Sequence, residues 1–480
     1  MKRVAIVGGG ISGLSAAVTL EDARRKGAAI EYTLLESAAR LGGVLRTEKV
    51  EGCVVEAGPD SFLTEKSWAA EFCRSLGIGE DLIFSNDAER KTYIAVNGRL
   101  IAMPDGLQFM VPTRIFPIAL SPLFSLGTKL RMAKEYFLRE KNGTDAANPA
   151  VDESVAGFIG RHFGQEMVDR LADPLLAGVY GGDAASLSAR SVMPRFVELE
   201  QRHGSLSRGL FRSRKQREKG DGRASAPRPI FTSLRNGMQQ MAEAAAAHLE
   251  PGRVQVNDTV RAVRRESDGW RVIGSRSATE VFESVIVATP AGVAAKLLEA
   301  VDGSLASELG QIPYSSSVTV ALGFEKKALA SALPGFGFLA PRAEGRRMLA
   351  CTFVHAKFPH RAPPQTALLR CFLGGSHDPA VLDLPDEELL RIVRQELREL
   401  IHVDAEPVFW RVYRWRQAMA QYAPGHGQRM AKIRTLQAGH PGLELAGNAY
   451  RGIGLPDCIA SGRQAALDAL KKLGLAGAAE

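Results

Sequence analysis

Three glycines, Gly8, Gly10 and Gly13, follow the apolar run Val4 to Val7 in the opening stretch "RVAIVGGGISGLSAAVTL". In this spacing the first glycine permits a tight turn, the second lets a pyrophosphate approach the backbone, and the third lets a helix pack on the strand. The free N–H groups at the start of that helix attract phosphate. The candidate phosphate-binding residues are Gly8, Gly9, Gly10, Ile11, Ser12 and Gly13.

A second strand, "IEYTLLE", ends in Glu36. An acidic side chain at this position suits the hydroxyls of a ribose and repels a 2′-phosphate. A strand, glycine turn, helix and second strand with an acidic end are far more specific together than the glycine motif alone. The chemistry predicted for this end of the chain is dinucleotide binding.

The residues after Glu36 discriminate between dinucleotides. "SAARLGGVLRT" contains Arg40 and the pair Gly42–Gly43, and it resembles the extended signature of the glutathione-reductase-like flavoproteins, particularly the amine oxidase group. In that group the arginine and the glycine pair lie along the FAD diphosphate and ribityl chain, so the resemblance implies FAD. It also implies a turn beside the isoalloxazine ring and a valine beside the adenine, here Gly58, Pro59, Asp60 and Ser61 in "EAGPDSFL", and Val260.

A glycine-rich stretch near the other end of the chain, "GNAYRGIGLPDCIASG" (447–462), lies between the strand-like "LELAG" and the helix-like "GRQAALDALKKL". This is again strand, turn and helix, and the helix start would stabilise negative charge at the pyrimidine end of a flavin. Asp457 is interpreted as a helix-end residue, and Cys458 as structural because no base lies near it in sequence. The candidate cofactor residues here are Gly447, Gly454, Leu455 and Pro456.

A narrower resemblance covers nearly the whole chain. The segments "GPDSFL", "NGRLIAMP", "FPIALSPLFSLGTKLRMA", "LADPLLAGVYGGDAASLSARSVMPRF", "VALGF", "RWRQAMAQY" and "GLPDCI" occur in this order. Together they resemble the flavin-dependent porphyrinogen oxidases of heme biosynthesis, most of all the soluble bacterial branch. The resemblance implies that Trp415 packs against the flavin and that Lys66 binds a substrate propionate. It suggests Arg90 and Lys91 more weakly, because the matching position holds Thr92.

The activity implied by the resemblance is oxidation of a porphyrinogen to a porphyrin, with six electrons passing to O2 to give H2O2. Coproporphyrinogen III is slightly favoured over protoporphyrinogen IX, and the product would be handed to a chelatase. The chemistry is centred on the flavin, so no catalytic side chain is expected. The alternatives are another amine-oxidase-like flavoenzyme, such as a carotenoid desaturase or polyamine oxidase, and a non-catalytic FAD- or porphyrin-binding protein.

The composition of the chain indicates which partners and which cellular compartment are compatible with the protein. The net charge is +8, but basic residues do not follow one helix with interleaved aromatics, which argues against nucleic acid. Five scattered cysteines and dispersed histidines argue against a metal site and for a reducing, cytoplasmic compartment. Prolines and Arg114 interrupt the apolar stretch 107–127, so we expect no membrane span there. Peripheral contact of this stretch with the inner face of the cell membrane is the further expectation.

The strands and helices expected around these residues indicate an α/β and α+β fold. An FAD-binding, Rossmann-like domain of the glutathione-reductase and amine-oxidase type would be assembled from discontinuous segments. A substrate-binding domain would contain an antiparallel sheet, and a helical domain would form a substrate-channel or membrane-facing wall. The FAD-binding domain is expected to comprise residues 1–90, 225–300 and 410–480. The substrate-binding domain would comprise 300–410 and the helical domain 105–205, and residues 206–224 would form a basic mobile loop.

Overall fold

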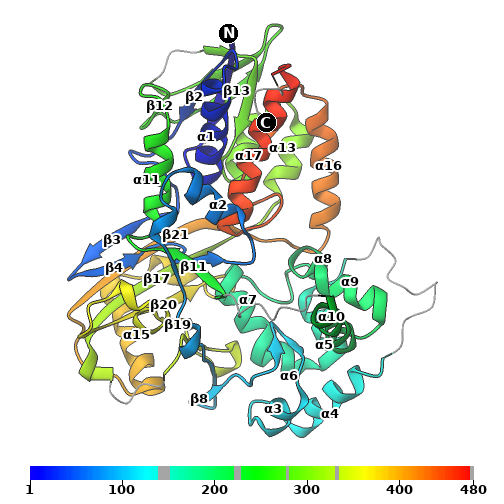
Figure 1. Cartoon of the computed structure of the whole chain (residues 1–480), viewed down its shortest axis with the longest axis vertical. Coiled ribbons are helices and arrows are strands. Elements are labelled where there is room, and N and C mark those ends of the chain that lie inside the picture. The colour runs from blue at the N-terminus through cyan, green and yellow to red at the C-terminus, as the bar shows by residue number, and fades with distance from the viewer. Residues whose placement is uncertain (139–151, 221–228, 277–279, 330–333, 476–480) are drawn as a thin grey trace.

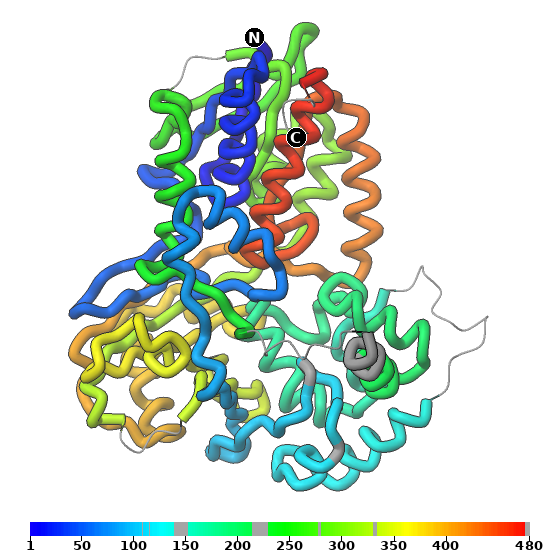
Figure 2. The backbone as a smooth tube through the Cα atoms, viewed as in Figure 1, coloured from blue at the N-terminus to red at the C-terminus, as the bar shows by residue number. Residues whose placement is uncertain are grey.

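The computed structural model describes most of the 480 residues (Figure 1). The described ranges are 1–138, 152–220, 229–276, 280–329 and 334–475. Figure 2 shows the path of the backbone in the same view, with the two ends of the chain running together in the upper part of the molecule.

A five-stranded parallel sheet forms the first layer, in the order β12-β2-β1-β16-β22. Its strands are β1 (Lys2–Val7), β2 (Ile30–Leu35), β12 (Val254–Gln255), β16 (Ser284–Val287) and β22 (Leu443–Leu445). Three distant parts of the sequence therefore build one sheet. This confirms the predicted Rossmann-like fold made from discontinuous segments.

Helices cover both faces of this sheet, which explains why β1 is apolar without alternation. Val4 and Ile6 belong to one core cluster with α1 and α17, whereas Ala5 and Val7 belong to another with α12 and α13. The helices around the sheet are α1 (Ile11–Arg25), α2 (Trp68–Ser75), α11 (Gln239–His248), α12 (Ala291–Leu298), α13 (Gly303–Gly310), α16 (His426–Ala438) and α17 (Leu455–Lys472).

A second, seven-stranded sheet has the order β21-β17-β20-β19-β18-β7-β8. Its strands are β7 (Thr92–Val96), β8 (Arg99–Ala102), β17 (Tyr314–Glu325), β18 (Gly337–Leu339), β19 (Met348–Phe353), β20 (Thr366–Gly374) and β21 (Phe409–Ala420). The helix α15 (Asp386–Ile401) packs its apolar side on this sheet. The pairs β17·β20, β20·β19 and β19·β18 are antiparallel, as expected for residues 300–410. The strand β7, from an earlier part of the chain, adds a parallel pair with β18, so the sheet as a whole is mixed.

A group of helices with its own core lies beside the second sheet, in the lower right of Figure 1. Its members are α3 (Ile115–Leu120), α4 (Leu126–Glu135), α5 (Val155–Phe163), α6 (Gln165–Met167), the π-helical turn η3 (Val168–Ala172), α7 (Asp173–Tyr180), α8 (Ala189–Val192), α9 (Pro194–His203) and α10 (Leu206–Gly220). Among the described residues, no helix has the length and apolar character needed to cross a membrane.

The expectation of a mobile loop at 206–224 was wrong for residues 206–220, which form α10. The charged residues of this stretch misled the interpretation, because its first apolar residues, Leu206 and Leu210, are buried in the core of the helical group. Residues 221–224 lie outside the described residues.

Short elements connect these layers. The strands are β3 (Thr47–Val50), β4 (Cys53–Glu56), β5 (Phe62–Leu63), β6 (Leu82–Phe84), β9 (Leu107–Gln108), β10 (Val111–Pro112), β11 (Phe231–Leu234), β13 (Ala262–Arg265), β14 (Trp270–Ile273) and β15 (Glu280–Phe282). The helical pieces are α14 (Val354–Lys357), η1 (Gly79–Asp81), η2 (Asp87–Glu89), η4 (Lys326–Leu329), η5 (Arg342–Glu344), η6 (Pro359–Arg361) and η7 (Pro379–Asp383).

Candidate functional site

The glycine loop between β1 and α1 has the geometry of a phosphate-binding turn. Gly8 has a φ of +107°, and a Cβ there would lie 2.8 Å from the carbonyl oxygen of Ala288. A Cβ at Gly13 would collide with the carbonyl oxygen of Gly8, whereas a Cβ at Gly10 would meet nothing within 4 Å. The backbone is thus tight behind the loop and open at Gly10, the N-cap of α1, where a diphosphate can reach the helix start.

Two neighbours of the loop were assigned to the cofactor from sequence. The side chain of Ser12 is buried, and its hydroxyl donates a hydrogen bond to the carbonyl oxygen of Cys458 on α17, 3.0 Å away. The carboxylate of Glu36 accepts hydrogen bonds from the N–H groups of Gly9 (2.6 Å) and Ala38 (2.7 Å). Glu36 therefore lies at the carboxyl ends of β1 and β2, the edge at which a doubly wound sheet binds its ligand.

Arg40 folds the next loop back against the first. Its guanidinium donates to the carbonyl oxygens of Leu45 (2.9 Å), Leu41 (3.1 Å) and Gly43. Gly42 and Gly43 both have positive φ, and the N–H of Gly42 donates to the carbonyl oxygen of Gly9 at 2.8 Å. The two glycine loops are consequently in direct backbone contact, and together they fit the extended diphosphate of FAD.

The turn at Gly58 packs against the second sheet. A Cβ at Gly58 would collide with the carbonyl oxygen of Val44 and would lie 3.6 Å from the ring of Trp415. The indole N–H of Trp415, on β21, donates to the carbonyl oxygen of Ala57 at 2.8 Å. The structure therefore brings Trp415 to the Gly58–Pro59 turn, two parts of the chain that were both assigned to the flavin from sequence.

A buried group of charges lies behind this turn. Asp60 contacts the ammonium of Lys357 at 3.2 Å and the guanidinium of Arg370 at 3.4 Å, and Arg370 also donates to the carbonyl oxygen of Gly58. Burial alone would raise the pKa of Asp60, but the charges of Lys357 and Arg370 outweigh it and hold that pKa far below its ordinary value. Burial lowers the pKa of Lys357, against the attraction of Asp60.

A second buried pair extends the group. Arg361 contacts Glu56 and also donates to the hydroxyl of Ser233, both at 2.5 Å. Ser233 in turn donates to the carbonyl oxygen of Asp60 at 2.6 Å. Sequence reasoning missed Lys357, Arg361 and Arg370, since they are single charges on separate elements with no motif around them.

At the carboxyl end of the chain, β22 leads into α17, which begins at Leu455 with Gly454 as its N-cap. The N–H of Gly447 donates to the hydroxyl of Ser461 at 3.2 Å. Cys458 is buried, and burial raises its pKa to about 12, so its thiol is not a nucleophile near neutral pH. This agrees with the structural role expected for Cys458.

The start of α17 holds the strongest substrate-binding candidate. Lys66 donates to both carboxylate oxygens of Asp457, in the first turn of α17, at 2.6 and 2.7 Å. The Lys66 side chain is 45% exposed and that of Asp457 is 18% exposed, so the lysine can be reached by solvent. The interpretation of Asp457 as a helix-end residue omitted this ion pair, which joins residues far apart in sequence.

The other two candidate substrate-binding residues have different neighbours. Arg90 forms a long ion pair with Asp87, 3.8 Å, at the surface. The carbonyl oxygen of Lys91 accepts from the N–H of Phe336, beside β18 at the edge of the second sheet. These contacts do not involve the first turn of α17, so of the three candidates Lys66 is the one that contacts this helix.

Tyr180, at the end of α7, lies near the start of α17. Sequence reasoning named no candidate residue in this part of the chain. Burial raises the pKa of Tyr180 to about 12, with the negative charge of Asp457 adding to the shift. The amide of Gln421 donates to the carbonyl oxygen of Tyr180 (2.7 Å) and to the hydroxyl of Ser315 (2.9 Å). The turn after α7 is thereby attached to β17 and to the end of β21.

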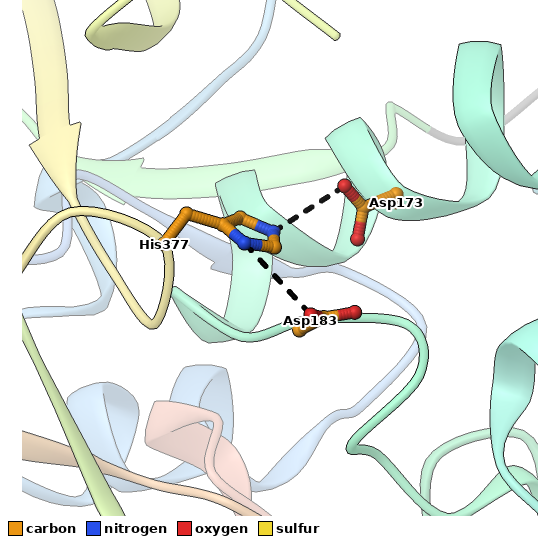
Figure 3. A group of neighbouring side chains, drawn as sticks. All are labelled: Asp173, Asp183 and His377. Carbon is orange, nitrogen blue, oxygen red and sulfur yellow. Dashed lines mark ion pairs between the residues drawn. The ribbon is translucent and has the colours of Figure 1, made fainter. Parts of the chain in front are cut away.

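Figure 3 shows the side chain of His377 between those of Asp173 and Asp183. His377 lies between Asp173 (3.4 Å), the first residue of α7, and Asp183 (3.8 Å), which follows the end of α7. Hydrogen bonding to Asp173 raises the pKa of His377 above its ordinary value, in spite of burial. The three side chains are close enough to share a cation. A protonated imidazole would pair with both carboxylates, whereas a neutral imidazole could bind a cation together with them.

Comparisons with known proteins agree with this geometry. The model of the family described as flavin containing amine oxidoreductase matches residues 11–470. A coproporphyrinogen III oxidase of Bacillus subtilis is 34% identical over 474 residues, 98% of each chain. The mitochondrial protoporphyrinogen oxidase of Nicotiana tabacum is 30% identical over 97% of this chain and 94% of its own.

A solved structure is similar throughout. A crystal structure from Exiguobacterium sp. 255-15, assigned provisionally as a protoporphyrinogen oxidase, superposes with a TM-score of 0.85 at 30% identity. The match covers 98% of this chain and 99% of the other. The similarity therefore extends over both sheets and the helical group and is not confined to the dinucleotide motif.

Proposed function

The chain belongs to the flavin containing amine oxidoreductase family, and from that premise we propose that it oxidises a porphyrinogen to the corresponding porphyrin in heme biosynthesis. One observation carries the proposal. A relative named as a coproporphyrinogen III oxidase aligns with this chain over 98% of both lengths, including the parts outside the FAD-binding loops.

FAD is the cofactor that family membership implies, and the open backbone at Gly10 and the paired glycine loops fit it. Bound FAD supplies the redox chemistry, taking up hydride from carbon and passing electrons to O2. Conversion of a porphyrinogen to a porphyrin removes six electrons and six protons, so three O2 become three H2O2. The chain itself has to bind the macrocycle, orient it and protect the site.

Lys66 is the residue proposed to recognise the substrate's carboxylates. Its ammonium is half-exposed at the first turn of α17 and already holds a carboxylate, that of Asp457. A propionate arriving from solvent would share or replace this contact, which is a charge-assisted hydrogen bond. Asp457 would keep Lys66 extended toward the helix start until the substrate arrives.

Trp415 and the turn after α7 are proposed to position the ring system. Trp415 is held by its hydrogen bond to Ala57, and the turn at Tyr180 is held by Gln421. Rigid supports of this kind keep the reacting carbon at a constant distance from the acceptor through successive oxidations. Arg90 and Lys91 remain weaker proposals, since their contacts lie elsewhere.

Coproporphyrinogen III is the substrate we favour over protoporphyrinogen IX. It carries four propionates, whereas protoporphyrinogen IX carries two propionates and two vinyl groups. A chain of net charge +8 favours the more anionic ligand in the encounter. The product would pass to a chelatase, which inserts a metal ion. The five cysteines are all unpaired and buried, which supports a reducing compartment such as the cytoplasm.

The test is an oxidation assay in air. Purified holoprotein is mixed with coproporphyrinogen III or protoporphyrinogen IX while porphyrin fluorescence and H2O2 are followed. We expect a rate above autoxidation, three H2O2 per porphyrin and a higher kcat/KM for coproporphyrinogen III. A yellow protein that gives no rate with either porphyrinogen would contradict the proposal. Polyamines and carotenes in the same assay would then test the other flavoenzyme activities, and inactivity with all of them would leave a binding protein.

A further inference from the structure

Five charged side chains are buried together behind the Gly58–Pro59 turn. Three are cations and two are carboxylates: Lys357, Arg361, Arg370, Glu56 and Asp60. None of these side chains is more than 16% exposed, and those of Arg361 and Arg370 are 1% and 3% exposed. We call these five residues the buried charge cluster. It holds one more positive charge than negative charges.

Carboxylates on the neighbouring elements β3 and η2 do not balance this excess. The strand β3 pairs with β4, and its Glu48 is already paired with Arg46 at 2.7 Å and with Arg411 at 3.3 Å. On η2, which packs against α14, Asp87 forms an ion pair with Arg90 at 3.8 Å. The other acidic residue of η2 is exposed to solvent. The excess positive charge therefore remains inside the fold.

Hydrogen bonding within the cluster shows the same excess. The Nε–H groups of Arg361 and Arg370 are buried, and no atom in the described part of the chain accepts a hydrogen bond from either. A buried cation without enough acceptors costs free energy, because it has lost its hydration. The ammonium of Lys357 lies 4.3 Å from the ring centre of Phe231 and 5.1 Å from that of Phe358, which stabilise it in part. The cluster therefore favours a negative charge in its neighbourhood.

The cluster is attached directly to the Gly58–Pro59 turn. Arg370 donates to the carbonyl oxygen of Gly58, and Asp60 is the residue that follows Pro59. Gly58 also lies against Trp415, since a Cβ at Gly58 would be 3.6 Å from the indole ring. The turn and Trp415 are the two parts of the chain proposed to lie beside the isoalloxazine ring. Burial keeps dissolved anions away from these cations, so their charge acts on a group bound at the turn.

We propose that the buried charge cluster raises the reduction potential of the bound flavin. The isoalloxazine ring is neutral when oxidised, whereas its two-electron-reduced form is an anion near neutral pH. A positive charge in a site of low dielectric constant stabilises the reduced form relative to the oxidised one. A higher reduction potential favours the uptake of hydride from carbon. This inference rests on the proposed place of the Gly58–Pro59 turn beside FAD, and it does not depend on the substrate.

The experiment measures two equilibrium properties of the holoprotein. The first is the reduction potential of the flavin, by titration against a reference dye. The second is the Kd of sulfite, which adds to N5 of oxidised flavins and leaves a negative charge on the ring. Lys357→Met removes the excess positive charge. We expect the affinity for reduced relative to oxidised flavin to fall about tenfold, which is about 30 mV for a two-electron couple, and the sulfite Kd to rise about tenfold.

Three further variants separate charge from structure. Glu56→Gln keeps an acceptor oxygen for Arg361 but adds to the excess positive charge, so it should raise the reduction potential and tighten sulfite binding. Asp60→Asn/Lys357→Met removes one charge of each sign and should have the reduction potential of the unmodified protein. Arg161→Met is the matched control, because it removes a half-buried cation from α5 in the helical group and should leave the reduction potential unchanged. The flavin absorbance spectrum and Tm of each variant verify that it is folded.

The direction of the shifts decides the outcome. Equal reduction potentials in all variants would overturn the proposal, as would shifts of the same sign in Lys357→Met and Glu56→Gln, which would indicate a damaged turn. An equal shift in Arg161→Met would overturn it as well. If Lys357→Met does not retain FAD, Glu56→Gln and Asp60→Asn/Lys357→Met still test the effect of charge. No porphyrinogen is used, so a failure here leaves the proposed reaction standing, and a protein inactive toward porphyrinogens can still be titrated.

Discussion

Lys357 and Arg370 are charged side chains that the fold buries on both sides of a single carboxylate. Removing a charge from water is costly unless a partner and hydrogen bonds replace the lost hydration. Here Asp60 is the partner of both cations, and Arg370 also bonds to the carbonyl oxygen of Gly58. The group therefore holds the main chain of the Gly58–Pro59 turn in place, the turn that is proposed to lie beside the flavin.

The first prediction removes one cation from this group. Lys357→Met should destabilise the protein by about 2–4 kcal/mol, because Asp60 keeps its charge but loses half of its compensation. FAD should also be released at a lower denaturant concentration than in the unmodified protein. Urea unfolding followed by tryptophan and flavin fluorescence measures both effects.

The control for that prediction is a double-mutant cycle. Asp60→Asn combined with Lys357→Met removes both charges, so the double variant should be less destabilised than the two single variants added together. Simple additivity, or a Lys357→Met protein as stable as the unmodified one, would show that the ion pair does not hold the turn.

A second prediction at this scale concerns Lys66 and Asp457. If Lys66 binds a propionate, Lys66→Gln should raise the KM for the porphyrinogen about fivefold with little change in kcat, because the contact is half-exposed. Asp457→Asn frees the same ammonium and should leave KM unchanged or lower it. Steady-state kinetics with both porphyrinogens measures this. An unaltered KM in Lys66→Gln would remove Lys66 from the substrate site.

At the scale of elements, sequence reasoning succeeded where a motif is local. The strand β1, the glycine turn and α1 could be read from one continuous stretch, and α17 begins at Leu455 as expected. Sequence reasoning failed where two interacting residues or strands are far apart in the sequence. Nothing near Lys66 in sequence points to Asp457, and nothing near β7 indicates that it pairs with β18. The sequence of α10 was predicted to be a loop because it contains many charged residues. The prediction did not take into account that Leu206 and Leu210 are buried.

The turn after α7 supports a prediction on pH. Because its pKa is raised in the folded protein, His377 binds its proton more tightly there than in the unfolded chain. Its stabilising contribution is therefore complete below about pH 6.5 and is lost as the pH rises through the folded-state pKa. His377→Gln should lower Tm by about 1 °C near the low end of this window, and the difference should vanish at alkaline pH.

Thermal unfolding of both proteins at a series of pH values measures this difference. His360→Gln, a change at an exposed histidine, is the matched control and should show no pH-dependent difference. A Tm difference that grows with rising pH would mean that the imidazole is not paired as a cation with Asp173 and Asp183.

For the whole molecule, the main consequence of the fold is that the two ends of the chain pack against each other beside the proposed flavin site. The hydroxyls of Ser12 and Ser15 on α1 donate to the carbonyl oxygens of Cys458 and Ile459 on α17, at 3.0 and 2.8 Å. The first turns of α1 are therefore joined to the start of α17 by side-chain hydrogen bonds. The proposed flavin site therefore depends on both ends of the chain.

Gly462 is where this contact is tightest and where it can be tested. A Cβ at Gly462 would collide with the carbonyl oxygen of Ser12, in the first turn of α1, the turn that is proposed to bind the diphosphate. Gly462→Ala should separate α1 from α17, destabilise the protein by about 1–3 kcal/mol and weaken FAD binding about tenfold. Gly427→Ala, on α16 with nothing within 4 Å of its Cβ, is the matched control and should be neutral or slightly stabilising. Titration of the flavin-free variants with FAD, followed by flavin fluorescence, measures affinity directly. Equal FAD affinity in the two variants would show that the contact between the chain ends does not support the cofactor site.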